Sequence, residues 1–140
     1  MNDPYTDIGI CVQRLYKEYR EHKKLIVAVD FDDTVFDFKN NNDTHDKMWK
    51  LLKRCQEQEF YIVCFTASSD ERYPFITEHF QNFGINISSI NKNPIPLKFG
   101  NHGKIYYNIL LDDRAGLKCA METLTAVLNL VEFEKSTENA

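Results

Sequence analysis

A short apolar run at residues 25–29 (LIVAV) passes without a break into the acidic segment DFDDT at positions 30–34. A run of this length, rich in β-branched residues and without alternation, is typical of a strand buried on both faces of a parallel sheet. Carboxylates at the end of such a strand are not packing residues, because an unpaired buried charge is costly. The feature therefore predicts a strand that brings acidic side chains to a site at its carboxyl end.

Further apolar runs alternate with helical patterns along the chain. We predict strands at residues 60–65, 85–90 and 105–111, and helices at about residues 6–22, 44–58, 68–83 and 115–134. Thr44 is the expected N-cap of the second helix, and Pro74 predicts a late start or a kink of the third helix near Tyr73. Strands that alternate with helices predict an α/β fold, here a single three-layer Rossmann-like domain with a mainly parallel sheet.

The chain of 140 residues fits one domain. We divide it into a leading helix (residues 1–24), a core (residues 25–134) and a flexible tail (residues 135–140). The formal net charge of −4 gives no bulk attraction to nucleic acid or to anionic membranes. The four cysteines form no C-x-x-C pair, and no apolar stretch approaches the ~20 residues of a membrane span. These features predict a cytoplasmic protein with free thiols and no membrane partner.

Three of the predicted strands end in polar residues. Asp30 and Asp32 follow the first strand, Thr66 follows the second, and Asp112 and Asp113 follow the last. In open α/β sheets, ligands bind outside the carboxyl ends of the strands, so these side chains are expected at one edge. Asp30 and Asp32 are two positions apart, a spacing that places both on one side of a strand.

These residue types suit phosphoryl transfer. One carboxylate can attack phosphorus, and a second can protonate the leaving oxygen and then deprotonate water. Asp112 adds a third carboxylate, and a carboxylate cluster favours a hard divalent cation, most plausibly Mg²⁺. Thr66 is expected at a helix start, where it and Ala67 would bind phosphate. Lys104 would supply a cation, with Lys98 as the alternative.

The same residues carry a resemblance to a known family. The segment DFDDT is similar to the first motif, D-x-D-x-T, of the haloacid dehalogenase (HAD) superfamily. Thr66, Lys104 and the pair Asp112 and Asp113 resemble its second, third and fourth motifs. The resemblance covers residues 25–120. The stretches SINKNP, GKI and LLDDR look more specifically like small bacterial and phage HAD-type hydrolases without a cap domain.

The resemblance implies a role for each matching residue. Asp30 would be the nucleophile and Asp32 the general acid and base. Asp30, the backbone carbonyl of Asp32, and Asp112 would hold Mg²⁺, with Thr34 and Asp113 in support. Many relatives carry glycine at the position of Asp33; Asp tolerates left-handed backbone better than most residues, so we expect the turn to survive.

The implied function is hydrolysis of phosphoric monoesters through an aspartyl-phosphate. The predicted elements fill the intervals around Thr66, so no cap domain fits and the site should be open. An open site suits a phosphorylated small molecule, nucleotides included, or a macromolecule. Phe36, Phe38 and Phe99 could stack on a base, although loop packing is the competing interpretation.

Three functional hypotheses remain open at this point. The first is the phosphatase acting on small phosphomonoesters. The second is a phosphatase of nucleic-acid ends or proteins, of which the nucleic-acid version is disfavoured by the acidic charge. The third is a non-catalytic regulatory module that binds metal or phosphate. The sequence leaves open the substrate, the pathway, the role of the leading helix and whether the chain forms a homo-oligomer.

Overall fold

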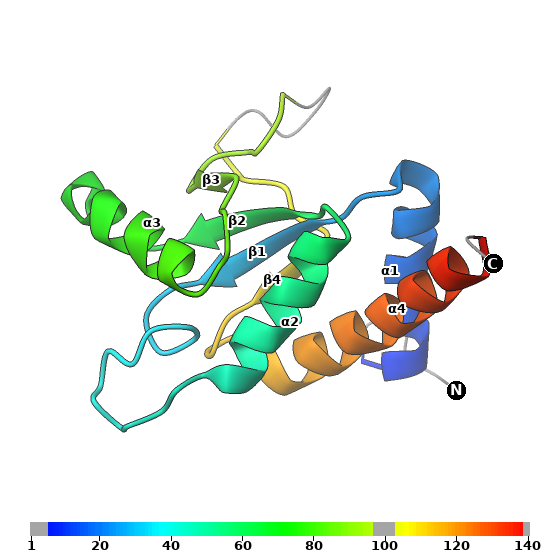
Figure 1. Ribbon diagram of the computed structural model, residues 1–140, viewed down its shortest axis with the longest axis horizontal. Helices are drawn as coiled ribbons and strands as arrows, with labels where there is room; N and C mark the ends of the chain where they lie inside the picture. Colours follow the sequence, from blue (N-terminus) through cyan, green and yellow to red (C-terminus); the bar gives the residue numbers. More distant parts are fainter. Residues whose placement is uncertain (1–5, 97–102, 139–140) are drawn as a thin grey trace.

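The computed structural model describes residues 6–96 and 103–138. Its centre is one four-stranded parallel sheet in the order β3-β2-β1-β4 (Figure 1). The strands are β1 (Ile26–Asp30), β2 (Tyr61–Phe65), β3 (Ser89–Ile90) and β4 (Ile109–Leu111). This confirms the predicted α/β class and the single Rossmann-like domain, and the described residues contain no cap domain.

The strand register aligns the carboxyl ends of the three strands that carry polar residues. Asp30 of β1 pairs with Phe65 of β2, and Val29 pairs with Leu111 of β4. Thr66 and Asp112 therefore each follow a residue that is paired with one of the last two residues of β1. The central strand is buried through Val29, as expected for a strand covered on both faces.

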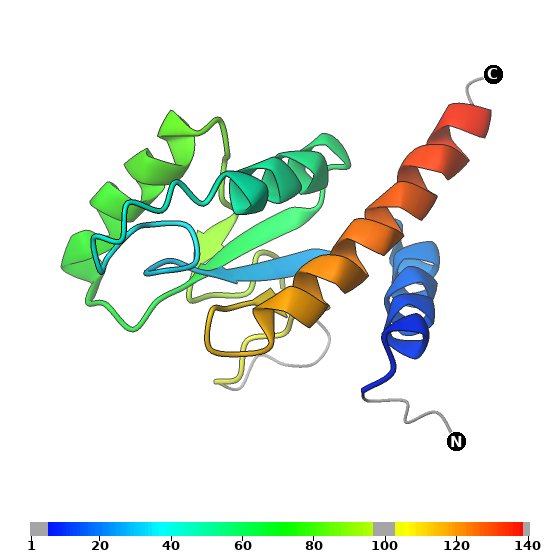
Figure 2. The ribbon, with the colours of Figure 1, turned by 90° about the horizontal axis from the view of Figure 1, so that it is seen from below.

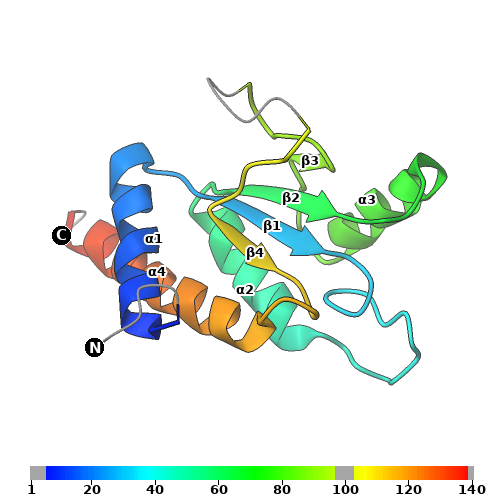
Figure 3. The same ribbon diagram turned by 180° about the vertical axis from the view of Figure 1, so that it is seen from behind.

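Two helices cover one face of this sheet, and a non-helical segment crosses the other face. The helices α2 (Asp46–Glu57) and α3 (Tyr73–Asn82) lie on one face, whereas residues 103–108 cross the opposite face (Figures 2 and 3). The helix α2 turns a continuous apolar stripe inward, formed by Met48, Trp49, Leu52 and Cys55. None of the described helices is long and apolar enough to span a membrane.

The first and last helices pack on each other. They are α1 (Ile8–His22) and α4 (Leu117–Glu138), and α4 also contacts β4. Leu15 and Tyr19 of α1 are buried, and the Tyr16 hydroxyl donates a hydrogen bond to Glu134 of α4 at 3.1 Å. The leading helix is thus an integral part of the core.

Four details of the predicted elements were wrong. The strands β3 and β4 are shorter than expected. Beside β3 the Ser88 hydroxyl accepts the N–H of Ile62, and beside β4 the Asn108 side chain accepts the N–H of Ile26. The helix α4 continues to Glu138, so residues 135–138 are helical instead of a loose tail. The N-cap of α2 is His45, without a side-chain cap bond, and not Thr44.

The expectation for the third helix was partly right. A 3₁₀ turn, η1 (Asp70–Arg72), comes first, and α3 begins only at Tyr73 with Pro74 in its first turn. Proline fits there because the first N–H groups of a helix have no intrahelical partner. The predicted start at residue 68 was too early, and the Ser68 hydroxyl accepts a hydrogen bond from the Arg72 side chain.

An aromatic cluster lies beneath the first motif. Phe31, between the two acids, is completely buried and stacks on Phe36 at 5.2 Å between ring centroids. The rings of Phe75 and His79 meet Phe31 edge-on. Because side chains alternate along an extended chain, burying Phe31 turns its two acidic neighbours toward the other side.

Candidate functional site

Three carboxylates meet at the carboxyl edge of the sheet. Asp30, Asp112 and Asp113 each offer an oxygen, and these oxygens lie within 4.8 Å of one another. They line one cavity of about 300 Å³ with Asp32, Asp33, Phe38, Lys39, Thr66, Ala67 and Arg114. The structure thus brings together the predicted residues of strands β1, β2 and β4.

Thr34 joins the first and last acidic segments. It is buried, and its Oγ1 lies 3.2 Å from Asp30 Oδ2 and 3.1 Å from Asp113 Oδ1. The same oxygen accepts the backbone N–H of Asp113 at 3.0 Å. A hydroxyl has one hydrogen, so it can donate to only one of the two carboxylates at a time. This contact fixes the spacing between the loops that follow β1 and β4.

The electrostatics of Asp30 reflect this crowding. Burial, a hydrogen bond with Asp113 and repulsion from Asp112 raise the pKa of Asp30 from 3.8 to about 7. A neighbouring positive charge would oppose each of these electrostatic effects. The cluster therefore has the charge and the spacing of a cation site.

The donor set tests which cation fits. All three clustered residues offer oxygen, and no histidine or cysteine joins them within the described part of the chain. Carboxylate oxygens suit Mg²⁺ or Ca²⁺ and do not suit soft metals. These donors are compatible with the predicted Mg²⁺, for which Asp30 and Asp112 would be the side-chain ligands. The backbone carbonyl of Asp32 stays a predicted ligand.

The Asp32 side chain is bonded by Arg72, a residue that we did not predict as part of the site. The Arg72 guanidinium donates to both carboxylate oxygens of Asp32, at 2.7 and 2.8 Å. The sequence distinguishes Arg72 in one respect, because it is the only lysine or arginine between Arg54 and Lys92. It lies six positions after Thr66, in the turn that precedes α3.

The turn after the first motif has the expected backbone. Asp33 has a φ of +60°, as its left-handed tolerance predicted. Its N–H donates to the carbonyl of Phe36 at 2.7 Å, and its side chain accepts the N–H of Lys39 at 3.2 Å. These bonds fold residues 33–39 into a compact loop along the cavity.

Thr66 is fixed by a residue from the neighbouring strand end. Asn91 accepts the Thr66 N–H at 2.9 Å and donates to the Thr66 carbonyl at 2.7 Å. The Thr66 hydroxyl accepts the N–H of Ser68 at 3.1 Å. We expected Thr66 at a helix start; it lies on a loop instead, because η1 intervenes before α3. Ala67 follows it on the cavity wall.

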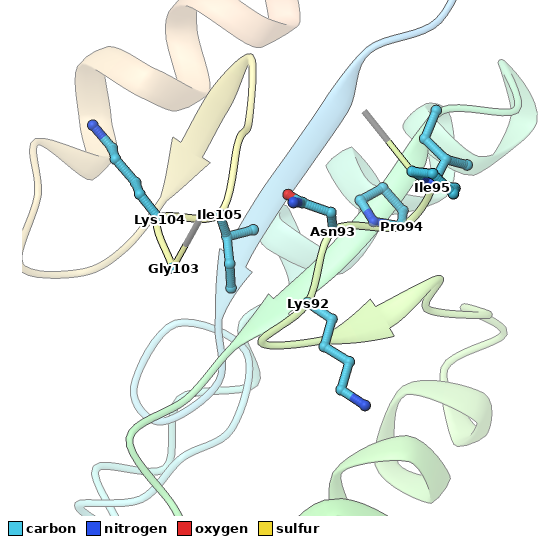
Figure 4. Close-up of a pocket in the computed structure, with 8 residues that line it drawn as sticks. Lys92, Asn93, Pro94, Ile95, Gly103, Lys104 and Ile105 are labelled. Carbon is cyan, nitrogen blue, oxygen red and sulfur yellow. The ribbon is translucent and has the colours of Figure 1, made fainter. Parts of the chain in front are cut away.

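Lys104 does not line this cavity. It is exposed and lines a separate hollow with Lys92, Asn93 and Ile105 (Figure 4). In that view its side chain points away from Asn93, and among the described residues it has no carboxylate partner within 4 Å. Its phosphate role stays a prediction, and the alternative, Lys98, lies outside the described residues, as does Phe99.

Two cations that we did not predict line the acidic cavity instead. They are Lys39, from the loop after the first motif, and Arg114, directly after the last acidic pair. Both are exposed. Position along the chain gave the only available signal, because Lys39 lies seven positions after Asp32 and Arg114 comes directly after Asp113.

The two described phenylalanines of the predicted rim differ in environment. Phe36 packs into the aromatic cluster, against Phe31, Phe75 and His79. Phe38 lines the acidic cavity and is 60% exposed. Packing therefore accounts for Phe36, whereas the exposed part of the Phe38 ring is accessible to a ligand.

Comparisons with known proteins add evidence for the fold. No protein-family model matches the sequence, and no curated protein matches it. One similar solved structure is described as the structure of a conserved protein coded by a locus from Bacteroides thetaiotaomicron. It superposes with a TM-score of 0.53 at 19% identity, over 66% of this chain and 78% of the other. At that identity the likeness supports the fold alone.

Proposed function

We propose that this protein is a magnesium-dependent phosphomonoesterase of the HAD superfamily, with Asp30 as the nucleophile. The observation that carries the proposal is the meeting of Asp30, Asp112 and Asp113 within 4.8 Å at the carboxyl edge of a parallel sheet. Asp32 and Thr66 line the same cavity, which matches the set that phosphoryl transfer requires.

The residues would divide the chemistry as follows. Asp30 and Asp112, with the carbonyl of Asp32, would hold Mg²⁺, which supplies positive charge for the phosphate and for the ionised nucleophile. The Asp30 carboxylate forms a bond to phosphorus while the bond to the leaving oxygen breaks, and Asp32 protonates that oxygen. Asp32 then takes a proton from water, which attacks phosphorus and releases phosphate and free Asp30.

The surroundings of the cavity favour particular substrates. Without a cap domain among the described residues, the cavity is open at its rim, and exposed Phe38 offers a flat apolar surface beside the acids. We therefore favour nucleotides among the phosphomonoesters, because every base has a face that can stack on an aromatic ring. We also propose a cytoplasmic location, which the four free cysteines favour.

A panel of phosphomonoesters tests the proposal. Nucleotides, sugar phosphates and glycerol phosphate would be incubated with wild type, with and without Mg²⁺, and beside Asp30→Asn. Asp70→Asn, on the exposed turn η1, is a matched control because it removes a carboxylate outside the cavity.

We expect metal-dependent hydrolysis that Asp30→Asn abolishes and Asp70→Asn retains. Full activity in Asp30→Asn would exclude an aspartyl-phosphate at this residue. Magnesium binding without hydrolysis of any ester, including protein and nucleic-acid phosphates, would instead favour the regulatory module.

A further inference from the structure

Arg72 bonds Asp32 through a forked contact, but it has no role in the chemistry proposed above. Both nitrogens at the end of the guanidinium bond the carboxylate, and one of them also donates to the Ser68 hydroxyl at 2.9 Å. Such two-point contacts fix the plane of a carboxylate as well as its position. A single-point ammonium contact would leave that plane free to rotate.

Arg72 is itself held in place by aromatic rings. Its guanidinium carbon lies 5.2 Å from the ring centroid of Phe31 and 5.7 Å from that of Phe36. The rings of Phe38 and Phe75 lie at 6.0 and 5.8 Å. A planar guanidinium can stack on rings and keep its fork at the same time, whereas lysine cannot.

The arrangement links the orientation of Asp32 to the protein core. Phe31, which the guanidinium contacts, is the buried residue next to Asp32 in the chain. The fork occupies two of the roughly four acceptor sites of the carboxylate, so the remaining sites can face a substrate in the cavity. Proton transfer depends on this kind of orientation, because the donor must reach the reacting oxygen at hydrogen-bond distance.

We propose that Arg72 is a positioning residue that holds the Asp32 carboxyl group in the orientation from which its proton reaches the leaving oxygen. The inference rests on the proposed phosphatase function. Arg72 is not among the residues that line the cavity, so it would act through Asp32 and not on the substrate.

The chain contains a matched control for this contact. Arg54 on α2 forms a second forked pair, with Glu132 on α4, at 2.8 and 2.9 Å. The exposed fractions of the two pairs are similar, at 26% and 31% for Arg72 and Asp32 and at 29% and 36% for Arg54 and Glu132. Replacing either arginine by lysine keeps the charge and removes the fork.

The test compares two esters in wild type, Arg72→Lys and Arg54→Lys, with Mg²⁺ present. Glycerol phosphate has a poor leaving group that needs a proton, and p-nitrophenyl phosphate has a good one that does not. The parameter to measure is kcat/KM, because it covers the steps through departure of the leaving group and excludes hydrolysis of the intermediate.

For Arg72→Lys we expect kcat/KM for glycerol phosphate to fall about 100-fold, which is the lower end of what a general acid contributes. The kcat/KM for p-nitrophenyl phosphate should stay within about threefold of the wild-type value, because its leaving group needs no proton. Arg54→Lys should change neither. Arg72→Met, which keeps an unbranched stem against the rings, should show the same selective loss and guards against poor folding of the lysine variant.

Other results would overturn the inference in distinguishable ways. Equal losses for both esters in Arg72→Lys would mean general distortion or direct phosphate binding. Unchanged kinetics would mean that the fork is structural only. If wild type hydrolysed no ester of the panel and neither of these two, the proposed function would fail first, and the role of Arg72 with it.

Discussion

Replacing Asp30 by asparagine should make the metal-free protein more stable while removing its activity. The carboxylate is held close to Asp112 and Asp113, and burial with these neighbours raises its pKa from 3.8 to about 7. An asparagine at this position carries no charge, and its amide can donate to the Asp113 carboxylate. The variant thus keeps a hydrogen bond and loses the repulsion.

The magnitude follows from the pKa difference. An acid whose pKa is higher in the folded state binds its proton more tightly there, so its contribution to stability is present below pH 4 and is lost as the pH rises to 7. The full difference corresponds to about 4 kcal/mol, and allowing for solvent screening of a partly exposed carboxylate leaves about 2 kcal/mol. Asp30→Asn should avoid this loss.

The assay is urea unfolding of wild type and Asp30→Asn from pH 5 to pH 8, in chelator and in Mg²⁺. In chelator, the stability advantage of the variant should grow by about 1 to 2 kcal/mol across this range. In Mg²⁺, the advantage should shrink or reverse, because ligand binding stabilises the folded wild type. An advantage that does not change with pH, or a variant less stable than wild type at pH 8 in chelator, would refute the electrostatic reasoning.

Two further substitutions test other parts of the site. Phe38→Leu should raise KM for nucleotides about tenfold, as expected for loss of one stacked base, and leave KM for glycerol phosphate unchanged. Phe83→Leu, at another exposed ring, is the control, and equal changes in KM for both substrates would exclude stacking. Thr34→Val should lower the free energy of unfolding by about 1 to 3 kcal/mol, because the Asp113 N–H loses its acceptor. Urea unfolding measures this loss, with Thr123→Val at another buried threonine as the control. Equal losses of stability at both positions would show that the Thr34 contacts add nothing specific.

The part of the site that the sequence predicts well depends on strand ends. Asp30, Thr66 and Asp112 each follow an apolar run, and parallel strands place their carboxyl ends at one edge. The strand order and register alone are therefore enough to predict that these three residues lie close together. The φ of Asp33 was predictable for a similar reason, since a local turn sets it.

The rest of the site depends on contacts between segments that have no periodic pattern. Arg72 and Asn91 lie outside the regular helices and strands. Arg72 is the one lysine or arginine between Arg54 and Lys92, but the sequence does not indicate that it bonds Asp32, or that Asn91 bonds Thr66. Lys104 was expected near the acids from its distance along the chain, but the bond from Tyr106 to Asn93 holds that segment beside another hollow. The short strands β3 and β4 have the same cause, because side chains replace backbone partners at their ends.

The packing of α1 on α4 has a consequence during synthesis. The buried face of α1, with Leu15 and Tyr19, packs mainly on α4, although Tyr19 also contacts Phe60. Most of this face therefore has no partner until α4 leaves the ribosome. About 95 residues separate the end of α1 from the start of α4, so at ~5–20 residues/s the nascent chain exposes that apolar face for roughly 5–20 s. The first helix is therefore the segment that we expect to need protection from aggregation during translation.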